Sequence, residues 1–267
     1  MVNTKEFYDY LNSKGMDFFA GVPDSLLKDL CACIKENSES SNNIITANEG
    51  NAVAIACGRY LSTSKIGVVY MQNSGLGNTV NPLLSLTDED VYRVPELLII
   101  GYRGEPGVHD EPQHVKQGKL TLPLLETMGI EYQILNENFK DQIDTAYSYM
   151  RETLKPYAIV VKKGTFSNYK LAKKNNDYPM TREESLEEIL GSLNEDDFVV
   201  STTGKTSREI FEIRERRNEG HGNDFLTVGS MGHTSSIALG MSLGTNKKVY
   251  CIDGDGSFIM HMGAIIY

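Results

Sequence analysis

The sequence predicts an α/β protein made of two tandem, doubly wound parallel-sheet domains of similar plan. Short apolar segments of strand length alternate with amphipathic segments of helical spacing along most of the chain, which is the pattern of parallel βαβ units. A polar stretch at residues 165–181 interrupts the alternation once, and the alternation then resumes. Ligands of such sheets bind beyond the carboxyl ends of the strands, so candidate sites are sought there.

We expect the first domain to span residues 1–164. Its helices repeat apolar residues at helical spacing, as Phe7, Tyr10 and Leu11 do before Gly15. Its strands are short apolar runs bounded by turn residues. The expected helices are 4–14, 26–34, 49–61 and 76–86, and the expected strands are 17–20, 42–46, 66–71, 96–101 and 157–162.

Residues 101–119 are expected to form a long loop after the strand at 96–101. The segment is mixed in charge and holds two of the chain's five histidines. Loops of this length after a parallel strand are commonly functional. The alternative is a solvent-exposed loop without a function.

The polar stretch at 165–181 lacks apolar periodicity, which predicts an interdomain linker. The second domain is expected over 182–267. Its expected helices are 182–192, 206–217 and 233–243, and its expected strands are 198–201, 225–228 and 249–252. Three strands are few for a doubly wound sheet, so we expect a truncated domain and favour a fragment over an unusually small domain.

Composition narrows the classes of protein. The chain of 267 residues is 40% hydrophobic and 23% charged, with a formal net charge of −10, which argues against a general affinity for nucleic acid or anionic membranes. The apolar runs are too short to span a bilayer, and the N-terminus has no secretory apolar region. The four cysteines show neither CxxC spacing nor a paired framework, which favours reduced thiols in the cytoplasm.

The turn Asp-Gly-Asp-Gly-Ser at 253–257 follows the strand 249–252 directly and precedes a new apolar segment. Its glycines let a ligand approach the backbone, helix-start amides face anions, and its carboxylates can bind Mg²⁺. An ordinary strand-to-helix turn is the alternative. An EF-hand is excluded, because Phe258 and Ala264 would occupy its glycine and glutamate positions.

Two further strand ends of the second domain have a similar character. The hydroxyl-rich turn 202–206 is no Walker A loop, because Val199 stands where the first glycine is needed. The segment 229–234, Gly-Ser-Met-Gly-His-Thr, combines two glycines with a histidine. For the turn 202–206 alone, the alternative is an ordinary helix cap. For the segment 229–234 alone, it is a histidine that is merely solvated. Three such strand ends in a row together favour a phosphate site.

In the first domain, Glu49 precedes a helix of small apolar residues that looks buried nearly all round. The carboxylate is therefore predicted to face a ligand or an interface, with a simple response to the helix dipole as the alternative. The segment Gln-Asn-Ser-Gly-Leu-Gly-Asn at 72–78 is a weak dinucleotide fingerprint, because Val80 replaces the third glycine.

Taken together, these segments resemble the thiamine diphosphate (ThDP) enzymes over essentially the whole chain. Glu49 before a small-residue helix, Gly-Ser-Met-Gly and Gly-Asp-Gly-Ser follow that family's order. The segments GVPDS, NEGNAVAIACG, QNSGLGN, STTGKTSRE, GSMGHTSSIALG and DGDGS are similar to those of phosphonopyruvate decarboxylases, with sulfopyruvate decarboxylases next.

The resemblance implies roles at the matching positions. Glu49 would hydrogen-bond the aminopyrimidine ring, Met231 would hold the cofactor bent, and the backbone around Gly229 would meet the pyrimidine. Asp255 would ligate Mg²⁺. The residues implied around the diphosphate are Gly204, Gly232, His233, Gly256 and Ser257.

The substrate side rests on weaker signals. By resemblance, Ser25 and His114 fall on the active-site wall of related decarboxylases. A phosphonate needs cations, and Arg103, Lys116 and Lys119 are candidates chosen by chemistry alone.

The family's activity would make this protein a ThDP- and Mg²⁺-dependent decarboxylase of a small anionic 2-oxo acid, 3-phosphonopyruvate, giving phosphonoacetaldehyde. The resemblance also implies a homodimer or higher homo-oligomer with sites between subunits. The family's metal motif continues to an asparagine downstream, so the partner ligand of Asp255 is expected beyond Tyr267, which leaves open whether the chain as given binds cofactor.

Three alternatives remain. A sulfopyruvate decarboxylase would share the same motifs, because phosphonate and sulfonate differ mainly in charge. A carboligase similar to acetolactate synthase is disfavoured, because 165–181 leaves no room for an extra central domain. A non-catalytic tandem Rossmann-like module would have no need of a carboxylate at Glu49.

Overall fold

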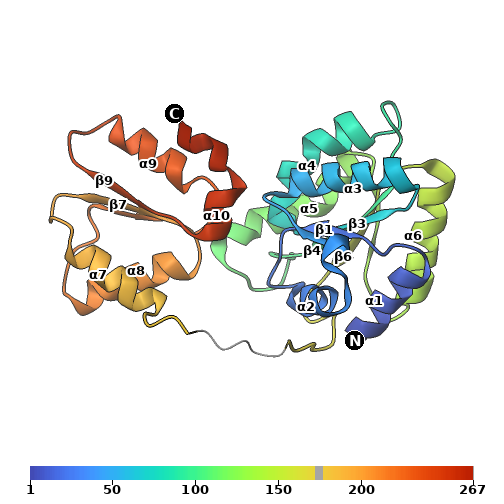
Figure 1. The fold of residues 1–267 in the computed structure, drawn as a ribbon, viewed down its shortest axis with the longest axis horizontal. Coiled ribbons are helices and arrows are strands. Elements are labelled where there is room, and N and C mark those ends of the chain that lie inside the picture. Colours follow the sequence, from blue (N-terminus) through green and yellow to red (C-terminus); the bar gives the residue numbers. More distant parts are fainter. Residues whose placement is uncertain (172–176, 267) are drawn as a thin grey trace. The chain divides into compact units, whose positions relative to one another are not determined.

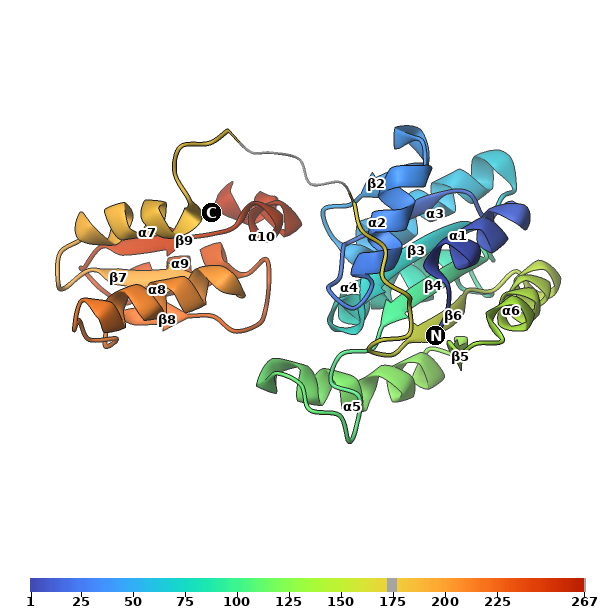
Figure 2. The same cartoon turned by 90° about the horizontal axis from the view of Figure 1, so that it is seen from below.

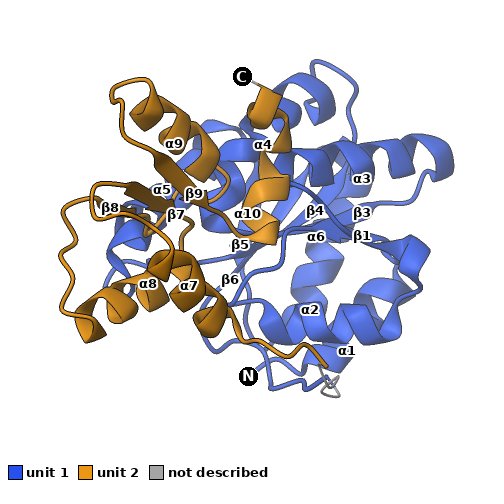
Figure 3. Ribbon diagram, turned by 60° about the vertical axis from the view of Figure 1, so that its left-hand side comes forward, with its two compact units in different colours: residues 1–173 blue, residues 174–267 orange. Residues whose placement is uncertain are grey.

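The computed structural model describes residues 1–171 and 177–266, which form two compact α/β units, Met1–Lys173 and Lys174–Tyr267 (Figure 3). The predicted α/β class with parallel sheets is thus confirmed. Part of the expected linker, residues 172–176, lies outside the described residues. Earlier in that stretch, Phe166 is buried and forms a bridge with Val2, so these residues pack on the first unit.

The first unit is built on a six-stranded sheet in the order β2-β1-β3-β4-β6-β5, in which each pair of neighbours is parallel (Figures 1 and 2). β4 is buried along its whole length, as expected of a central parallel strand covered on both faces. The strands are β1 (Phe19–Gly21), β2 (Asn43–Ile45), β3 (Gly67–Gln72), β4 (Glu96–Gly101), β5 (Glu131–Ile134) and β6 (Tyr157–Val161).

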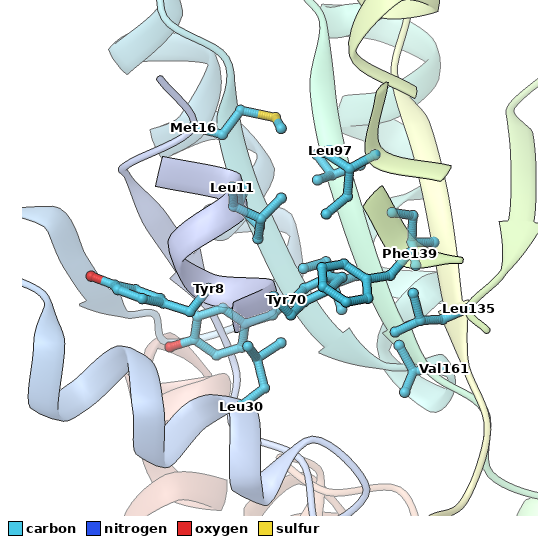
Figure 4. Close-up of a cluster of buried hydrophobic side chains, with 14 of the residues drawn as sticks. Tyr8, Leu11, Met16, Leu30, Tyr70, Leu97, Leu135, Phe139 and Val161 are labelled. Carbon is cyan, nitrogen blue, oxygen red and sulfur yellow. The ribbon is translucent and has the colours of Figure 1, made fainter. Parts of the chain in front are cut away.

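Helices cover both faces of this sheet because successive strand side chains point to opposite sides. Val68 and Tyr70 of β3 join a core with α1, α2 and α6, of which Figure 4 shows Tyr70 and its neighbours. Val69 and Met71 join a second core with α3, α4 and α5 on the other face. The helices are α1 (Thr4–Ser13), α2 (Lys28–Asn37), α3 (Glu49–Thr63), α4 (Leu76–Pro82), α5 (Pro112–Thr127) and α6 (Phe139–Thr153). α4 continues as a π-helical turn, Leu83–Thr87.

The expectation of a loop over 101–119 was wrong in its second half, because α5 begins at Pro112. Proline suits this first helical position, where its missing N–H is not needed. The early part of α5 packs through Gly118, where a Cβ atom would collide with the carbonyl of Gly104. A contact made by glycine backbone leaves no apolar periodicity, so the sequence pattern concealed this part of the helix. β5 and α6 were not predicted either.

The second unit has three described parallel strands in the order β8-β7-β9, with α7 and α8 on one face and α9 on the other (Figure 1). A capping box at Thr181 and Glu184 begins α7. The elements are α7 (Arg182–Gly191), β7 (Phe198–Ser201), α8 (Lys205–Arg216), β8 (Asp224–Leu226), α9 (Thr234–Ser242), β9 (Val249–Ile252) and α10 (Asp255–Met260).

All four cysteines are free. Over residues 1–171 and 177–266, no helix has both the length and the apolar character needed to cross a membrane.

Candidate active site

The carboxyl ends of β1, β3 and β4 lie side by side in the first unit. In the sheet register, Gly21 of β1 stands opposite Tyr70 of β3, and Gln72 of β3 stands opposite Gly101 of β4. The segments that leave these three strands therefore emerge along one edge, which is where ligands of parallel sheets bind.

Glu49 opens α3 with a side chain that is only 5% exposed. Its Oε2 accepts a hydrogen bond from Nδ2 of Asn78 at 2.7 Å. Its Oε1 lies against Gly75, at a position where any Cβ atom would collide with it. A carboxylate whose only role was a favourable interaction with the helix dipole would not need to be buried, to accept a hydrogen bond from an amide and to pack on a glycine.

Ser25 and Arg103, which lie far apart in the sequence, meet in this unit. Nη1 of Arg103 donates to Oγ of Ser25 at 3.0 Å, and Nε donates to Oδ2 of Asp110 at 2.8 Å. The hydrogen bonds from Arg103 hold the pKa of Asp110 well below its usual range. The guanidinium is therefore fixed in orientation by a carboxylate and presents one edge to the serine.

His114 lies in the first turn of α5 and is half-buried. Burial, and then the charge of Arg103, lowers the pKa of the imidazole, so the ring is neutral at pH 7. Its Nδ1 is buried and has no hydrogen-bond partner among the described residues. The ring can therefore offer a hydrogen bond without bringing a charge.

Lys116 and Lys119 also lie on α5, where both side chains are exposed. Neither lines the cleft described below, so any contact of these lysines with substrate stays a prediction.

Asp24 was not predicted as a site residue, although it precedes Ser25 in the segment GVPDS. Its carboxylate is 5% exposed and accepts hydrogen bonds from Nε2 of Gln72 at 2.6 Å and from the N–H of Leu26 at 3.1 Å. Burial raises its pKa, against the opposing effect of the hydrogen bond from Gln72. The adjacent Gly101 has no room for a Cβ atom beside Asp24.

Asn73 is the second residue that the sequence did not single out. Its side chain is buried, and its Nδ2 donates to the carbonyl of Arg103 at 2.7 Å and to Oγ1 of Thr121 at 2.8 Å. Its Oδ1 accepts from the N–H of Arg103 at 3.1 Å. Asn73 therefore fixes the backbone of Arg103 between β3 and α5. The amide-rich segment 72–78 was the available signal.

A cleft of about 360 Å³ opens at this edge of the first unit. It is lined by Ser25, Arg103 and Asp110 together with two lysines, Lys28 and Lys163, that sequence reasoning did not select.

In the second unit, the carboxyl end of β7 lies between those of β8 and β9, since Ser201 stands opposite both Leu226 and Ile252. A cleft of about 570 Å³ lies at this edge. Thr202 and Thr203, Met231, and the whole turn 253–257 contribute to its lining.

Gly232 and Ser257 are brought into contact across two of these strand ends. The N–H of Gly232 donates to Oγ of Ser257 at 3.0 Å, and the serine is buried. Gly232 has a φ of +91°, and a Cβ atom there would lie 2.5 Å from Nδ1 of His261. Met231 reaches the same turn, since its Cε lies 3.1 Å from where a Cβ on Gly256 would stand.

The remaining predicted residues of this unit lie around the same edge. Gly204 has a φ of +93° and immediately precedes α8. Gly229 is half-buried, and His233 is exposed with its ring 4.6 Å from the ring of His261.

Asp255 is the first residue of α10, and its exposed side chain accepts from the N–H of Gly256 at 2.8 Å. Over residues 1–171 and 177–266 there is no group of three or more His, Cys, Asp or Glu side chains arranged to hold a metal ion. Asp253 is the other carboxylate in the lining of this cleft.

Comparison with known families gives two matches. Residues 3–123 match the N-terminal TPP binding domain of thiamine pyrophosphate enzymes, and residues 202–267 match the C-terminal TPP binding domain. These segments contain Glu49 and the turns that follow the three strands of the second unit.

Individual relatives cover nearly all of the chain. A phosphonopyruvate decarboxylase of Streptomyces viridochromogenes is 33% identical over 99% of this chain and 69% of its own length. A sulfopyruvate decarboxylase of Methanosarcina acetivorans is 26% identical over 100% of this chain and 72% of its own. Among solved structures, benzoylformate decarboxylase from Polynucleobacter necessarius is 18% identical with a TM-score of 0.49, and the match covers 76% of this chain and 39% of that one.

Proposed function

This chain belongs to the thiamine diphosphate-dependent decarboxylase family, and we propose that it catalyses the Mg²⁺-dependent, non-oxidative decarboxylation of 3-phosphonopyruvate to phosphonoacetaldehyde and CO₂. The proposed catalytic activity is supported mainly by Glu49. Its buried carboxylate lies at the start of a helix, accepts a hydrogen bond from Asn78 and packs on Gly75. The choice of substrate is supported by 33% identity to a phosphonopyruvate decarboxylase over 99% of the chain.

The residues present fit ThDP at both ends of the cofactor. In the first unit, the carboxylate of Glu49 is proposed to bind a ring nitrogen of the aminopyrimidine and to hold a proton there. The contact with Gly75 suits this task, because the missing Cβ atom gives the carboxylate the space that it occupies. When bound, ThDP supplies the electron sink that takes up the electron pair released as CO₂ leaves.

In the second unit, glycines and hydroxyls surround the place proposed for the diphosphate. Gly232 cannot carry a side chain, and its N–H is already ordered by Ser257. This hydrogen bond holds the turns 229–234 and 253–257 together, and the glycines of these turns let an anion come close to the backbone. The residues proposed to surround the diphosphate are Gly204, Gly232, His233, Gly256 and Ser257, with Met231 and Gly229 on the pyrimidine side.

Mg²⁺ is proposed to bind Asp255, because hard cations prefer oxygen ligands and readily share them with phosphate oxygens and water. One protein carboxylate is compatible with such shared coordination. The proposed metal dependence is tested by removing divalent cations with a chelator and restoring activity with Mg²⁺.

Two residues are proposed to act on the substrate itself. Ser25 is held by Arg103 and can hydrogen-bond the 2-oxo acid, while the neutral ring of His114 can exchange a proton with the reacting centre. In the overall reaction the C–C bond to the carboxylate breaks, CO₂ departs, and the former carbonyl carbon takes up a proton.

We further propose a cytoplasmic homodimer or higher homo-oligomer, in which the first unit of one copy and the second unit of another complete each site. The free cysteines support the location, and the resemblance to ThDP enzymes supports the assembly. No nucleic acid or membrane partner is proposed.

Sulfopyruvate is the second candidate substrate, favoured by the relative from Methanosarcina acetivorans. The two are separated by measuring CO₂ release from phosphonopyruvate and sulfopyruvate side by side, with ThDP and Mg²⁺, using the full-length protein. We expect faster turnover of phosphonopyruvate. Faster turnover of sulfopyruvate would overturn the choice of substrate.

The same assay separates a catalyst from a non-catalytic module. Glu49→Gln keeps the size of the side chain and its contact with Asn78, so the fold should persist while CO₂ release is lost. An active Glu49→Gln variant would contradict the proposed role of the carboxylate.

A further inference from the structure

The cleft of the first unit is bordered by segments that leave three different strands. Ser25 and Lys28 follow β1, Arg103 follows β4, and Lys163 follows β6. Its volume of about 360 Å³ suits a small molecule. Every residue of its lining belongs to the first unit, so the cleft exists without any contribution from elsewhere.

The acidic side chains of the cleft already have partners. Asp110 is paired with Arg103, and Glu105 is paired with Lys162 at 2.5 Å. Asp29 accepts a hydrogen bond from the N–H of Tyr169 at 3.0 Å. These carboxylates are therefore bound to groups of the protein itself.

Lys28 and Lys163 differ from these carboxylates. Both side chains are exposed at the cleft, and within residues 1–171 and 177–266 neither forms an ion pair. Arg103 is already oriented by Asp110, so it presents a fixed cation beside Ser25. Asp110 compensates the charge of Arg103, and Asp29 keeps its own charge because a backbone N–H does not neutralise it. The two unpaired ammonium groups still leave the cleft with a net positive charge, which favours an anionic group over a neutral one.

We propose that this cleft is the specificity site for the charged tail of the substrate, with Lys28 and Lys163 binding its phosphonate oxygens and Arg103 placing Ser25 at the other end of the molecule. The inference rests on the proposed function, because it assigns the part of the 2-oxo acid that is not transformed. Lys28 and Lys163 thus take the phosphonate-binding role for which Lys116 and Lys119, which do not line the cleft, were the candidates from the sequence.

The test compares Lys28→Met and Lys163→Met with Lys35→Met, Lys116→Met and Lys119→Met in the full-length protein. Lys35 is an exposed lysine on the same helix as Lys28 and does not line the cleft. Each cleft variant should lose roughly tenfold or more in kcat/KM for phosphonopyruvate, mainly through KM, as expected for a lost hydrogen bond to a charged group. Turnover of pyruvate, which lacks the charged tail, should change little.

A binding measurement keeps this inference separate from the proposed function. Phosphonoacetate, which cannot be decarboxylated in this way, is titrated into each protein by calorimetry, with acetate as the neutral-tail control. We expect phosphonoacetate to bind the wild type and the Lys35→Met variant and to lose roughly tenfold or more in affinity in each cleft variant.

The outcomes are distinguishable. If the wild type releases no CO₂ from phosphonopyruvate, the proposed function fails, while the phosphonoacetate titration still tests the cleft. Unchanged phosphonoacetate affinity and kcat/KM in both cleft variants would overturn the cleft assignment and leave the proposed function standing. Losses confined to Lys116→Met or Lys119→Met would also overturn it, as would equal losses with pyruvate.

Discussion

Gly75 lies so close to Glu49 that a Cβ atom on the glycine would collide with Oε1 of the carboxylate. The glycine follows β3 and the glutamate begins α3, so the contact joins two segments at the carboxyl edge of the sheet. In this position Oε2 of Glu49 accepts the hydrogen bond from Asn78.

The first prediction concerns this contact. Gly75→Ala should displace the carboxylate of Glu49 and reduce kcat for CO₂ release by roughly a hundredfold, because misplacing a catalytic group by about 1 Å is that costly. Gly77→Ala is the matched control, since Gly77 is exposed in α4 and a Cβ atom there meets nothing within 4 Å. A Gly75→Ala enzyme as active as the Gly77→Ala enzyme would refute the packing argument.

The second prediction concerns Asn73. Asn73→Ala removes three hydrogen bonds of a buried amide, including the one that it donates to the carbonyl of Arg103, so the free energy of unfolding should fall by about 2–3 kcal/mol. Urea unfolding measures the change. Asn81→Ala, on the exposed side of α4, should shift it by less than about 0.5 kcal/mol. Equal shifts for the two variants would show that the buried network contributes little.

The third prediction concerns Glu96, at the start of β4. Its carboxyl is fully buried, neither oxygen has a hydrogen-bond partner among the described residues, and burial raises its pKa well above the ordinary value of 4.5 for a glutamate. The folded protein therefore keeps a proton that the unfolded chain releases. Stability should be fully present below pH 4.5 and fall as pH rises towards the folded pKa, by at most about 1.4 kcal/mol per pH unit.

The Glu96→Gln variant has no carboxyl group to titrate at this position. Its free energy of unfolding should therefore not fall with rising pH on this account, and at pH 8 it should exceed that of the wild type. The exposed Glu131 at the start of β5 provides the control variant Glu131→Gln, which should follow the wild-type pH profile. Identical pH profiles for the wild type and Glu96→Gln would mean that the buried carboxyl does not hold its proton.

The fourth prediction concerns Gly232 in the second unit. Gly232→Ala places a Cβ atom 2.5 Å from Nδ1 of His261 at a φ of +91°, so the turn that positions the N–H towards Ser257 should shift. The dissociation constant for ThDP should rise at least roughly tenfold. Gly240→Ala in α9 meets nothing within 4 Å and should bind ThDP normally. Equal ThDP affinity for both variants would argue against this turn as part of the diphosphate site.

The sequence by itself determined the fold class, most of the strands, and the family. The strand 96–101 was located correctly because a buried parallel strand is apolar on both faces and therefore visible as a continuous run. Glu49 was singled out because a helix of small apolar residues follows it, but the expectation that this helix is buried nearly all round was wrong. Ala52, Val53, Ala56 and Cys57 are buried, whereas Ala54 and Ile55 on the other face of α3 are exposed. Such signals are local, and a single segment carries them.

The tertiary structure alone decided which segments meet. Ser25 and Arg103 are 78 positions apart, and they bond because the strand order places β1 and β4 on either side of β3. Lys28 and Lys163 share a cleft for a similar reason, and α5 stayed hidden because it packs through Gly118 against Gly104. Periodicity states which side of a segment faces the sheet, but it does not state which strands are neighbours, and the neighbours decide the chemistry of the site.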